Sequence, residues 1–401
     1  MDRIVVVGAG QAGASLCARL RAKGYTGALT LIGAEPVPPY QRPPLSKAYL
    51  LGEMPVERLY LRPESFYADQ GIDLRLGAPV TGIDRDSRTV TVGDEVLHWD
   101  ALALTTGSAP RRLPAATGGG LDGVATVRTL ADVDDMAPRF AEGARVLIVG
   151  GGYIGLEAAA VAAKRGLHVT LVEMNDRILG RVAAPETAEV FRTLHRDAGV
   201  DLREGVGLDR LLGEDRVEAA RLTDGTEIPA DFVIAGVGIA PATDLAEAAG
   251  LEIADGIATD EMGRTSDPNI WAAGDCASFP WNGGRLRLES VGHAIDQAEA
   301  VADNMLGAGT PYVAKPWFWS DQYDTKLQIA GLNAGHDRVV RRAGKAGSVS
   351  FWYFAGDRLL AVDAMNDPRA YMVAKRLIEA GRSPDPDAVA DPETDLKALL
   401  A

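Results

Sequence analysis

Two glycine-rich turns, each between a strand pattern and a helix pattern, constrain this chain more than any other feature. The first follows the β-branched run that begins at Arg3, and the second follows the apolar run that begins at Arg145. After each turn, small and apolar residues recur at helical spacing up to a glycine, Gly24 or Gly166. A second apolar strand pattern comes next. These repeats predict an α/β fold with two Rossmann-type parallel sheets, each covered by helices.

The first turn reads Gly8-Ala9-Gly10-Gln11-Ala12-Gly13, the GxGxxG fingerprint of a dinucleotide site. The first glycine permits a tight turn, the second lets the backbone approach a pyrophosphate, and the third allows close helix–strand packing. Glu35 lies 22 residues after Gly13, where a carboxylate can accept hydrogen bonds from ribose hydroxyls. This context disfavours the alternative of a purely structural glycine turn.

The second turn, Gly150-Gly151-Gly152-Tyr153-Ile154-Gly155, repeats the fingerprint, and Glu173 follows its last glycine after 18 residues. A carboxylate suits an unphosphorylated ribose, whereas a 2′-phosphate favours arginine. Glu173 therefore predicts NADH. Arg177 and Arg181 lie nearby in the sequence and leave NADPH as the alternative.

Two dinucleotide sites in one chain predict FAD together with a nicotinamide cofactor. The segments Thr105-Thr106-Gly107 and Ala273-Gly274-Asp275 each close an apolar strand pattern. Asp275 can then face the ribityl hydroxyls of FAD, and an ordinary surface turn is the alternative for each segment. After Pro311 the pattern changes to antiparallel strands and a helix, which predicts an α+β C-terminal domain. The predicted division is an FAD-binding domain over 1–107 and 236–311, an NAD-binding domain over 108–235, and a C-terminal domain over 312–401.

The composition excludes several classes of protein. Lys and Arg total 41 against 56 Asp and Glu, a formal net charge of −15. An acidic surface repels nucleic acid and anionic membranes, so neither is an expected partner. The two cysteines, Cys17 and Cys276, form no CxxC or CxxxxC pair, so we predict neither a metal site nor a redox disulfide. With no signal peptide and no long apolar run, we expect a cytoplasmic protein.

Longer motifs carry a resemblance that spans the chain. They are PPYQRPPLSKAYL (38–50), LTTGSAPR (104–111), TSDPNIWAAGDCA (265–277), LESVGHAIDQA (288–298) and FWSDQYDTKLQIAGL (318–332). With the glycine motifs, these resemble the NADH-dependent ferredoxin reductases of the putidaredoxin reductase type. The resemblance implies a glutathione-reductase-like two-dinucleotide fold whose C-terminal domain covers the flavin.

The resemblance also implies roles for individual residues. Lys47 would lie near flavin N5 and pair with Glu157 beside the nicotinamide, as the two catalytic residues, and Trp319 would cover the flavin. The remaining expected FAD contacts are Gly8, Gly10, Ala12, Gly13, Glu35, Arg42, Val80, Thr106, Gly107, Arg128, Asp275 and Val291. The expected NAD contacts are Gly150, Gly152, Tyr153, Ile154, Gly155, Glu173 and Gly238.

Each assignment has a plainer alternative. Lys47 and Glu157 could be an ordinary surface pair, and Trp319 could be core packing. Arg128 could be a linker charge, while Val80 and Val291 could touch FAD through backbone alone. His293 is left without a role because hydride transfer to a flavin needs no histidine.

The implied reaction takes a hydride from NADH and passes single electrons to a [2Fe–2S] ferredoxin that serves a cytochrome P450 or another oxygenase, because flavin can hold two, one or no extra electrons. The rivals are a rubredoxin reductase, a monodehydroascorbate-type reductase, and an apoptosis-inducing-factor-like NADH-binding flavoprotein. We expect a monomer or weak dimer.

The acceptor is expected to be acidic and to dock on the C-terminal domain, because residues 313–383 carry 11 basic and 7 acidic side chains. The densest basic group there is Arg338, Arg341, Arg342 and Lys345. The alternative is a solvated basic loop far from the flavin, in which case Arg58 or Arg287 would be better candidates.

Overall fold

The computed structural model describes residues 1–400, and the chain divides into two compact units that are treated one at a time. Unit 1 comprises Met1–Gln41, Val56–Ala109 and Ile239–Pro316, and unit 2 comprises Arg42–Pro55, Pro110–Gly238 and the chain from Trp317 onward. The predicted NAD-binding and C-terminal regions thus fall in the same unit, while the three-domain division stays a prediction.

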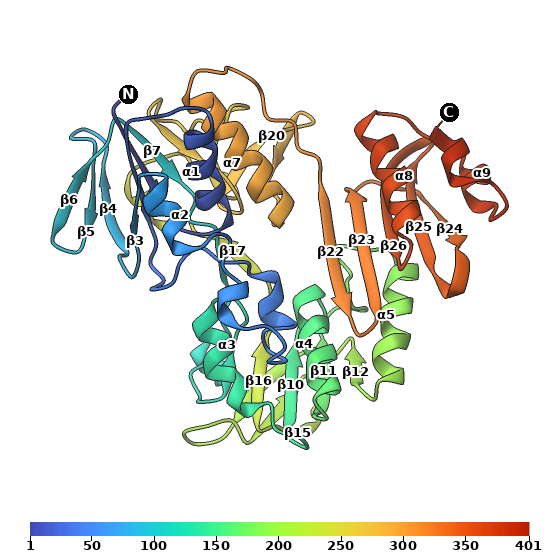
Figure 1. The fold of residues 1–401 in the computed structure, drawn as a ribbon. Helices are drawn as coiled ribbons and strands as arrows, with labels where there is room; N and C mark the ends of the chain where they lie inside the picture. The colour runs from blue at the N-terminus through green and yellow to red at the C-terminus, as the bar shows by residue number, and fades with distance from the viewer. Residues whose placement is uncertain (401) are drawn as a thin grey trace. The chain divides into compact units, whose positions relative to one another are not determined.

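Unit 1 is built on a parallel five-stranded sheet with the order β19-β7-β1-β2-β3 (Figure 1). Its strands are β1 (Arg3–Val7), β2 (Ala28–Ile32), β3 (Ile72–Arg75), β7 (Ala101–Leu104) and β19 (Ile270–Ala272). Ile4 and Val6 of β1 pack in the core with helices α1 (Gln11–Ala22) and α7 (Val291–Met305). Val5 and Val7 point into a second core, as the two-residue period of a strand requires.

Smaller elements surround this sheet. Antiparallel strands β4 (Val80–Asp84), β5 (Thr89–Val92) and β6 (Glu95–His98) form one layer. The others are α2 (Glu64–Asp69), η2 (Val56–Arg58), α6 (Asp244–Ala248), β8 (Ser108–Pro110), β17 (Ile239–Pro241), β18 (Ile257–Ala258), β20 (Ala277–Trp281) and β21 (Gly284–Leu286).

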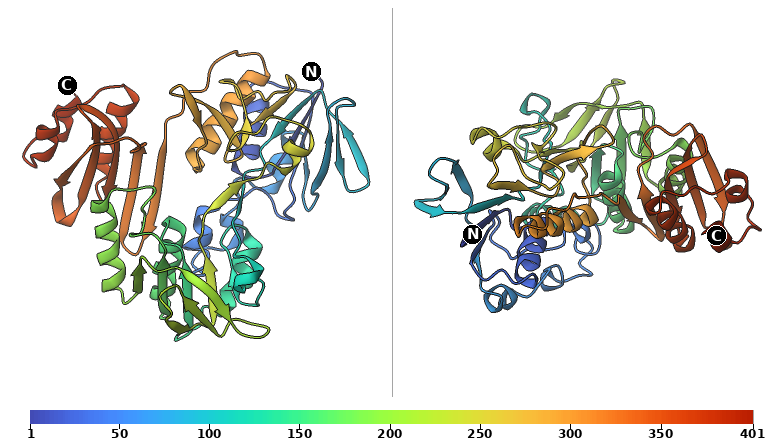
Figure 2. Two further views of the ribbon diagram at one scale, coloured as in Figure 1. Left: turned by 180° about the vertical axis from the view of Figure 1, so that it is seen from behind. Right: turned by 90° about the horizontal axis from the view of Figure 1, so that it is seen from above.

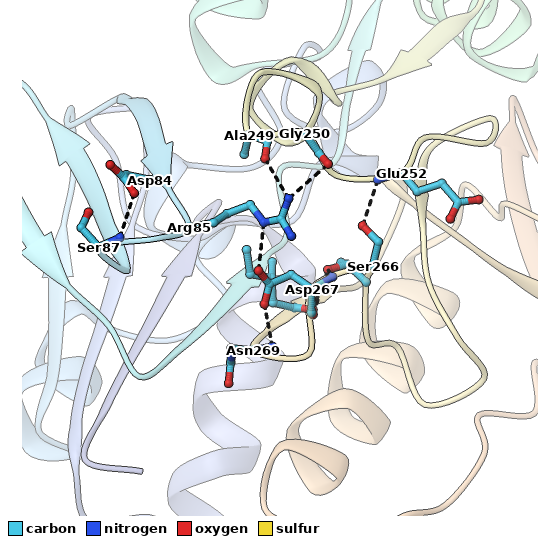
Figure 3. Close-up of polar contacts among 11 residues, drawn as sticks. Asp84, Arg85, Ser87, Ala249, Gly250, Glu252, Ser266, Asp267 and Asn269 are labelled. Atoms are coloured by element: carbon cyan, nitrogen blue, oxygen red, sulfur yellow. Dashed lines mark hydrogen bonds and ion pairs between the residues drawn. The ribbon is translucent and has the colours of Figure 1, made fainter.

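Arg85 ties distant segments of unit 1 together just after β4 (Figure 3). Its Nε lies 2.9 Å from Asp267 Oδ2, and its Nη1 donates to the carbonyls of Ala249 and Gly250 at the end of α6. Asp267 also accepts from the Asn269 N–H at 2.9 Å, which shapes the turn before β19. One side chain thus fixes three loops against each other.

Unit 2 repeats the parallel sheet, with the order β12-β11-β10-β16-β9. Its strands are β9 (Val124–Ala125), β10 (Arg145–Val149), β11 (His168–Glu173), β12 (Asp201–Glu204) and β16 (Phe232–Ala235). The helices are α3 (Leu130–Met136), α4 (Tyr153–Lys164) and α5 (Pro185–Asp197), and β13 (Leu208–Leu212), β14 (Ala219–Leu222) and β15 (Glu227–Pro229) form an antiparallel layer. The short helices are η1 (Pro43–Ser46), η3 (Ala115–Thr117) and η4 (Ala137–Arg139).

The same unit holds an antiparallel five-stranded sheet with the order β22-β23-β26-β25-β24 (Figure 1). In Figure 2 its strands are the orange to red arrows. Its strands are β22 (Trp317–Gln322), β23 (Thr325–Gly331), β24 (Arg338–Ala343), β25 (Val349–Ala355) and β26 (Arg358–Met365). Helix α8 (Pro368–Glu379) packs on β23 and β26, and η5 (Lys345–Gly347), α9 (Pro386–Ala390) and η6 (Leu396–Leu400) complete the region. Two parallel sheets and an α+β C-terminal region confirm the predicted fold class.

Candidate functional site

Two of the three fingerprint glycines of unit 1 have a steric reason to be glycine. A Cβ on Gly8, whose φ is +114°, would lie 2.2 Å from the carbonyl oxygen of Thr105, and one on Gly13 would lie 2.0 Å from that of Gly8. Gly10 has an ordinary φ of −94°, and a Cβ there would meet no heavy atom of the described residues within 4 Å. The protein itself does not require glycine at position 10.

Unit 2 shows the same arrangement. A Cβ on Gly150 would lie 2.4 Å from the carbonyl oxygen of Gly236, and one on Gly155 would lie 2.1 Å from that of Gly150. Gly152 has a φ of −80°, and a Cβ there would again find open space in the part of the chain that the structure describes. Both middle glycines begin a helix, where backbone N–H groups and the helix dipole attract phosphate. Each turn therefore fits a dinucleotide whose pyrophosphate would occupy the space left by the missing Cβ.

The two partner carboxylates are held by different groups. Glu35 accepts a hydrogen bond from the Tyr40 hydroxyl at 2.6 Å. Glu173 is buried, and its oxygens accept from the backbone N–H of Gly151 at 2.8 Å and of Asn175 at 2.9 Å. Glu173 thus supports the second glycine turn through the Gly151 N–H. Its contact with the ribose stays a prediction.

Arg177 and Arg181, the two arginines that kept NADPH as an alternative cofactor, make different contacts in the structure. Arg177 donates from Nη2 to the carbonyls of Gly180 and Ala183, so its guanidinium holds the loop after β11. Arg181 is exposed, and its Nη2 lies 3.8 Å from the position of a Cβ on Gly238. Arg177 is thus bonded to the protein backbone, whereas no such bond is seen for Arg181 among the described residues.

Other predicted FAD residues lie at the carboxyl ends of unit 1 strands. Asp275 accepts from the Ser108 hydroxyl at 2.8 Å, and Thr106 donates to the carbonyl of Ala242 at 2.6 Å. Thr105 Oγ1 donates to the carbonyl of Gly8 at 2.8 Å and so supports the glycine turn directly. The remaining predicted positions in this unit are Ala12, which is buried in α1, Val80, which packs half-buried on the second core, Gly107, which has a φ of +71°, and Val291, which begins α7.

Lys47 and Glu157 form an ion pair in unit 2, with the half-buried Lys47 Nζ 2.6 Å from Oε2 of the buried Glu157. The Ser46 hydroxyl donates to the same oxygen at 2.8 Å, and the Ser320 hydroxyl donates to Oε1 at 2.7 Å. Only 5% of the Glu157 side chain is exposed, so the surface-pair alternative is wrong. Pro43 and Pro44 occupy the first two positions of η1, where their fixed φ favours a helix start. Ser46 and Lys47 lie at the other end of this short helix.

The remaining predicted residues of unit 2 make the following contacts. Arg42 donates to the carbonyl of Arg128 at 2.6 Å. The rings of Trp317 and Trp319 stack at 5.4 Å and are half-buried, which leaves both roles of Trp319 open. Tyr153 packs against Phe318, Ile154 is exposed at the start of α4, and Gly238 has a φ of +96°.

Arg342 is not part of a docking surface, contrary to the sequence prediction. It is 5% exposed, and its guanidinium donates to the carbonyls of Val389, Asp391 and Thr394, which fastens the C-terminal segment to β24. Arg338 pairs with Asp387 at 2.9 Å. Strand β24 is the edge opposite to β22, so this basic group and Trp319 lie four strand spacings apart, about 19 Å.

Several plainer features complete the chemistry. His293 is buried, its Nδ1 lies 3.0 Å from the Tyr312 hydroxyl, and burial lowers the pKa of this histidine to about 4. Cys17 and Cys276 are both buried thiols. Among residues 1–400, no cluster of His, Cys, Asp and Glu has the makings of a metal site, and no helix there combines the length and apolar character needed to cross a bilayer.

Comparisons with known proteins decide the family. Residues 2–298 match the model of the pyridine nucleotide-disulphide oxidoreductases, and residues 317–400 match the reductase C-terminal domain. The chain belongs to the pyridine nucleotide-disulphide oxidoreductase family.

Relatives along the whole chain narrow the family. Putidaredoxin reductase of Pseudomonas putida is 42% identical over 413 residues, covering 100% of this chain and 97% of its own length. The ferredoxin–NAD(+) reductase component of the anthranilate 1,2-dioxygenase system of Burkholderia cepacia is 39% identical and covers 100% and 99%. In the crystal structure of a covalent putidaredoxin reductase–putidaredoxin complex, one chain superposes with a TM-score of 0.95 at 41% identity, covering 100% and 98%.

This chain is therefore an FAD-dependent, NADH-using oxidoreductase of the putidaredoxin reductase type, as its motifs predict. Sequence reasoning missed the roles of three side chains, although Thr105 lies in a segment that it singled out. Ser46 and Ser320 both reach Glu157, and Thr105 supports the first glycine turn. Both serines lie inside the quoted motifs, but a serine has no periodic signal that would reveal its partner.

Proposed function

We propose that this chain takes a hydride from NADH and delivers single electrons to a [2Fe–2S] ferredoxin that serves an oxygenase. The observation that carries the proposal is the ion pair of Lys47 with the buried Glu157, which lies on the helix that starts at the second glycine turn. Bound FAD would accept the hydride and release electrons one at a time. The protein's task is then to hold the nicotinamide and to supply charge where the electron pair arrives.

The residues divide this task. Gly150, Gly152 and the N-terminus of α4 would bind the pyrophosphate of NADH, and Glu173 would accept from the ribose hydroxyls. Lys47 would supply a fixed positive charge that stabilises the negative charge developing on hydride transfer. Glu157 holds the ammonium group at one position, since three donors reach its two oxygens.

For the acceptor, the observations favour the β22 edge of the C-terminal sheet. Trp317 stacks on Trp319 there, and the Lys375 ammonium group of α8 lies 5.5 Å from the centre of the Trp317 ring. Arg376 and Met372 on the same helix are exposed. A face with aromatic rings, an apolar side chain and basic groups suits an acidic ferredoxin. We call Trp317, Trp319, Met372, Lys375 and Arg376 the α8–β22 face.

Stopped-flow spectroscopy tests the proposal. The purified protein should release FAD on heating, NADH should reduce that flavin in a single turnover, and a [2Fe–2S] ferredoxin should reoxidise it in two one-electron steps. Lys47→Ala should slow flavin reduction about 10²-fold, because a fixed charge at the reacting centre is lost, and should leave FAD content unchanged. Lys164→Ala, which removes an exposed lysine of α4, is the matched control. Faster reoxidation by rubredoxin or ascorbyl radical than by ferredoxin would support the rival reductases.

A further inference from the structure

A line of hydrogen-bonded side chains in unit 2 leads from Glu157 to the last turn of α5. Ser320 Oγ lies 2.7 Å from Glu157 Oε1, and Gln322 Nε2 lies 3.1 Å from Ser320 Oγ. Gln322 Oε1 lies 2.8 Å from His195 Nε2, and the Tyr323 hydroxyl lies 3.2 Å from His195 Nδ1. Ser320, Gln322 and His195 are each 0% exposed. Four consecutive hydrogen bonds thus join the ion pair to a buried histidine and a tyrosine.

The carboxylate at one end fixes the direction of every bond in this line. Glu157 can only accept, so Ser320 spends its single hydroxyl proton on it. Gln322 must then donate its amide N–H to Ser320 and present its carbonyl oxygen to His195. His195 must therefore carry its proton on Nε2, and its Nδ1 accepts from the Tyr323 hydroxyl. All four donors point toward Glu157.

The two ring side chains keep the protonation states that this pattern needs. Burial lowers the pKa of His195 below 6.5, although its bond to Gln322 opposes the shift, so the imidazole is neutral near pH 7. Burial raises the pKa of Tyr323 far above its usual range, so the hydroxyl keeps its proton. Tyr323 also has a φ of +56°, an unfavourable conformation for a bulky residue, and its ring packs edge-on against His195.

The same line fixes strand β22. Ser320 bonds to Glu157 of α4, and Gln322 bonds to His195 of α5. Trp317 and Trp319 occupy the other alternate positions of the same strand. Because strand side chains alternate between faces, bonds made through positions 320 and 322 also set where the tryptophans point.

We propose that Ser320, Gln322 and His195 form a positioning relay, which holds Glu157 and hence Lys47 in the geometry for hydride transfer and locks the strand that carries Trp319. The inference rests on the proposed role of the Lys47–Glu157 pair. These are positioning residues because they act through Glu157 and not on the nicotinamide itself.

The chain supplies a matched control on the same helix. Thr187 of α5 is 0% exposed, and its hydroxyl lies 2.7 Å from Asp363 Oδ2 and 3.2 Å from the Tyr353 hydroxyl. It therefore ties α5 to the same C-terminal sheet as His195 does, but through bonds that do not lead to Glu157. Thr187→Val removes buried hydrogen bonds of α5 to that sheet without breaking the relay.

Single-turnover flavin reduction by NADH separates positioning from general loosening. Ser320→Ala and His195→Leu should each lower the limiting rate of flavin reduction about tenfold, because each removes one hydrogen bond of the line that leads to the Glu157 carboxylate. The Kd for NADH should stay nearly unchanged. His195→Gln, which keeps a donor for Gln322, should recover most of the rate. Thr187→Val should reduce at the original rate. Equal slowing by Thr187→Val and His195→Leu would overturn the relay.

A second measurement reports on the relay without turnover. The protein has five histidines, and ¹⁵N chemical shifts distinguish the two imidazole tautomers. His195, assigned by its loss in His195→Gln, should show the Nε2–H form, and Ser320→Ala should populate the Nδ1–H form because the Gln322 amide is then free to turn. An Nδ1–H form in the unmodified protein would overturn the proposal.

The Lys47 variant distinguishes failure of the relay from failure of the proposed function. If Lys47→Ala leaves flavin reduction unchanged, the proposed function fails. If Lys47→Ala slows it but Ser320→Ala does not, only the relay fails.

Discussion

The two units begin with the same device and use the rest of their residues differently. In each, the first and third glycines avoid clashes with the protein's own backbone, and the middle glycine leaves space for a ligand. Around the first turn, Asp275 and Glu35 are held by Ser108 and Tyr40. Unit 2, with the second turn, holds the ion pair of Lys47 with the buried Glu157 and the stacked tryptophans. We infer that the glycine turn binds the pyrophosphate in either unit, and that the neighbouring side chains distinguish the unit that retains FAD from the unit that takes the hydride.

The largest effect should come from filling the space at the two middle glycines. Gly10→Val should yield a folded, colourless protein without FAD. Gly152→Val should stay yellow but bind NADH roughly 100-fold more weakly, about 2.7 kcal/mol, because the new side chain occupies the pyrophosphate position. Visible absorbance and an NADH titration measure the two outcomes.

Gly13→Ala and Gly155→Ala provide the contrast, because their Cβ atoms would lie 2.0 and 2.1 Å from backbone oxygens. These variants should lose thermal stability, whatever they do to ligands. Equal ligand and stability effects at the third and middle positions would break the proposed division of roles.

A smaller effect should follow from removing the charge at Glu173. Glu173→Gln keeps oxygen and adds an amide, so part of the brace on the Gly151 N–H survives while repulsion of a 2′-phosphate disappears. The ratio of kcat/KM for NADH over NADPH should fall about tenfold, or about 1.4 kcal/mol. Asp176→Asn, which neutralises an exposed carboxylate in the same loop, should leave the ratio unchanged. A rise in NADPH use in both variants would point to general electrostatics.

Electron delivery should depend on the α8–β22 face and not on strand β24. Arg376→Glu should raise the KM for an acidic ferredoxin about fivefold at low salt and flatten the salt dependence of the rate, since charge steering is screened as the Debye length falls from roughly 30 to 8 Å. Arg341→Glu makes the same charge change on the far edge strand and serves as the control. A larger effect of Arg341→Glu would restore the docking site predicted from sequence.

What the sequence could predict follows from how local each feature is. Strand β1, its glycine turn and helix α1 are contiguous, so periodicity and glycine spacing reveal them. The meeting at Glu157 is not local, since Ser46 and Ser320 are 111 and 163 residues away from it in the chain. Only the resemblance indicated Lys47. Arg342 was misassigned because a sequence records charge but not whether a guanidinium turns inward to backbone carbonyls.

The last prediction concerns a residue of unit 1 that should affect the free energy of unfolding but not flavin reduction. Burial raises the pKa of Asp267, but the Asn269 N–H and the Arg85 guanidinium outweigh it and hold that pKa below the ordinary 3.8. Because the folded-state pKa is the lower one, the stabilisation is present above about pH 4 and is lost as pH falls through the folded value. Arg85→Ala should cost about 1 kcal/mol at pH 7, a modest figure because 36% of the Arg85 side chain is exposed to screening solvent. The loss of unfolding free energy should shrink in acid, and flavin reduction should not change.

A surface ion pair in unit 2 provides the control. Arg221→Ala removes the pair with Glu227, in which both side chains are exposed, and should give no measurable shift of the urea midpoint. A pH-independent cost at Arg85 would mean that its bonds to the carbonyls of Ala249 and Gly250, and not its charge on Asp267, hold these loops together.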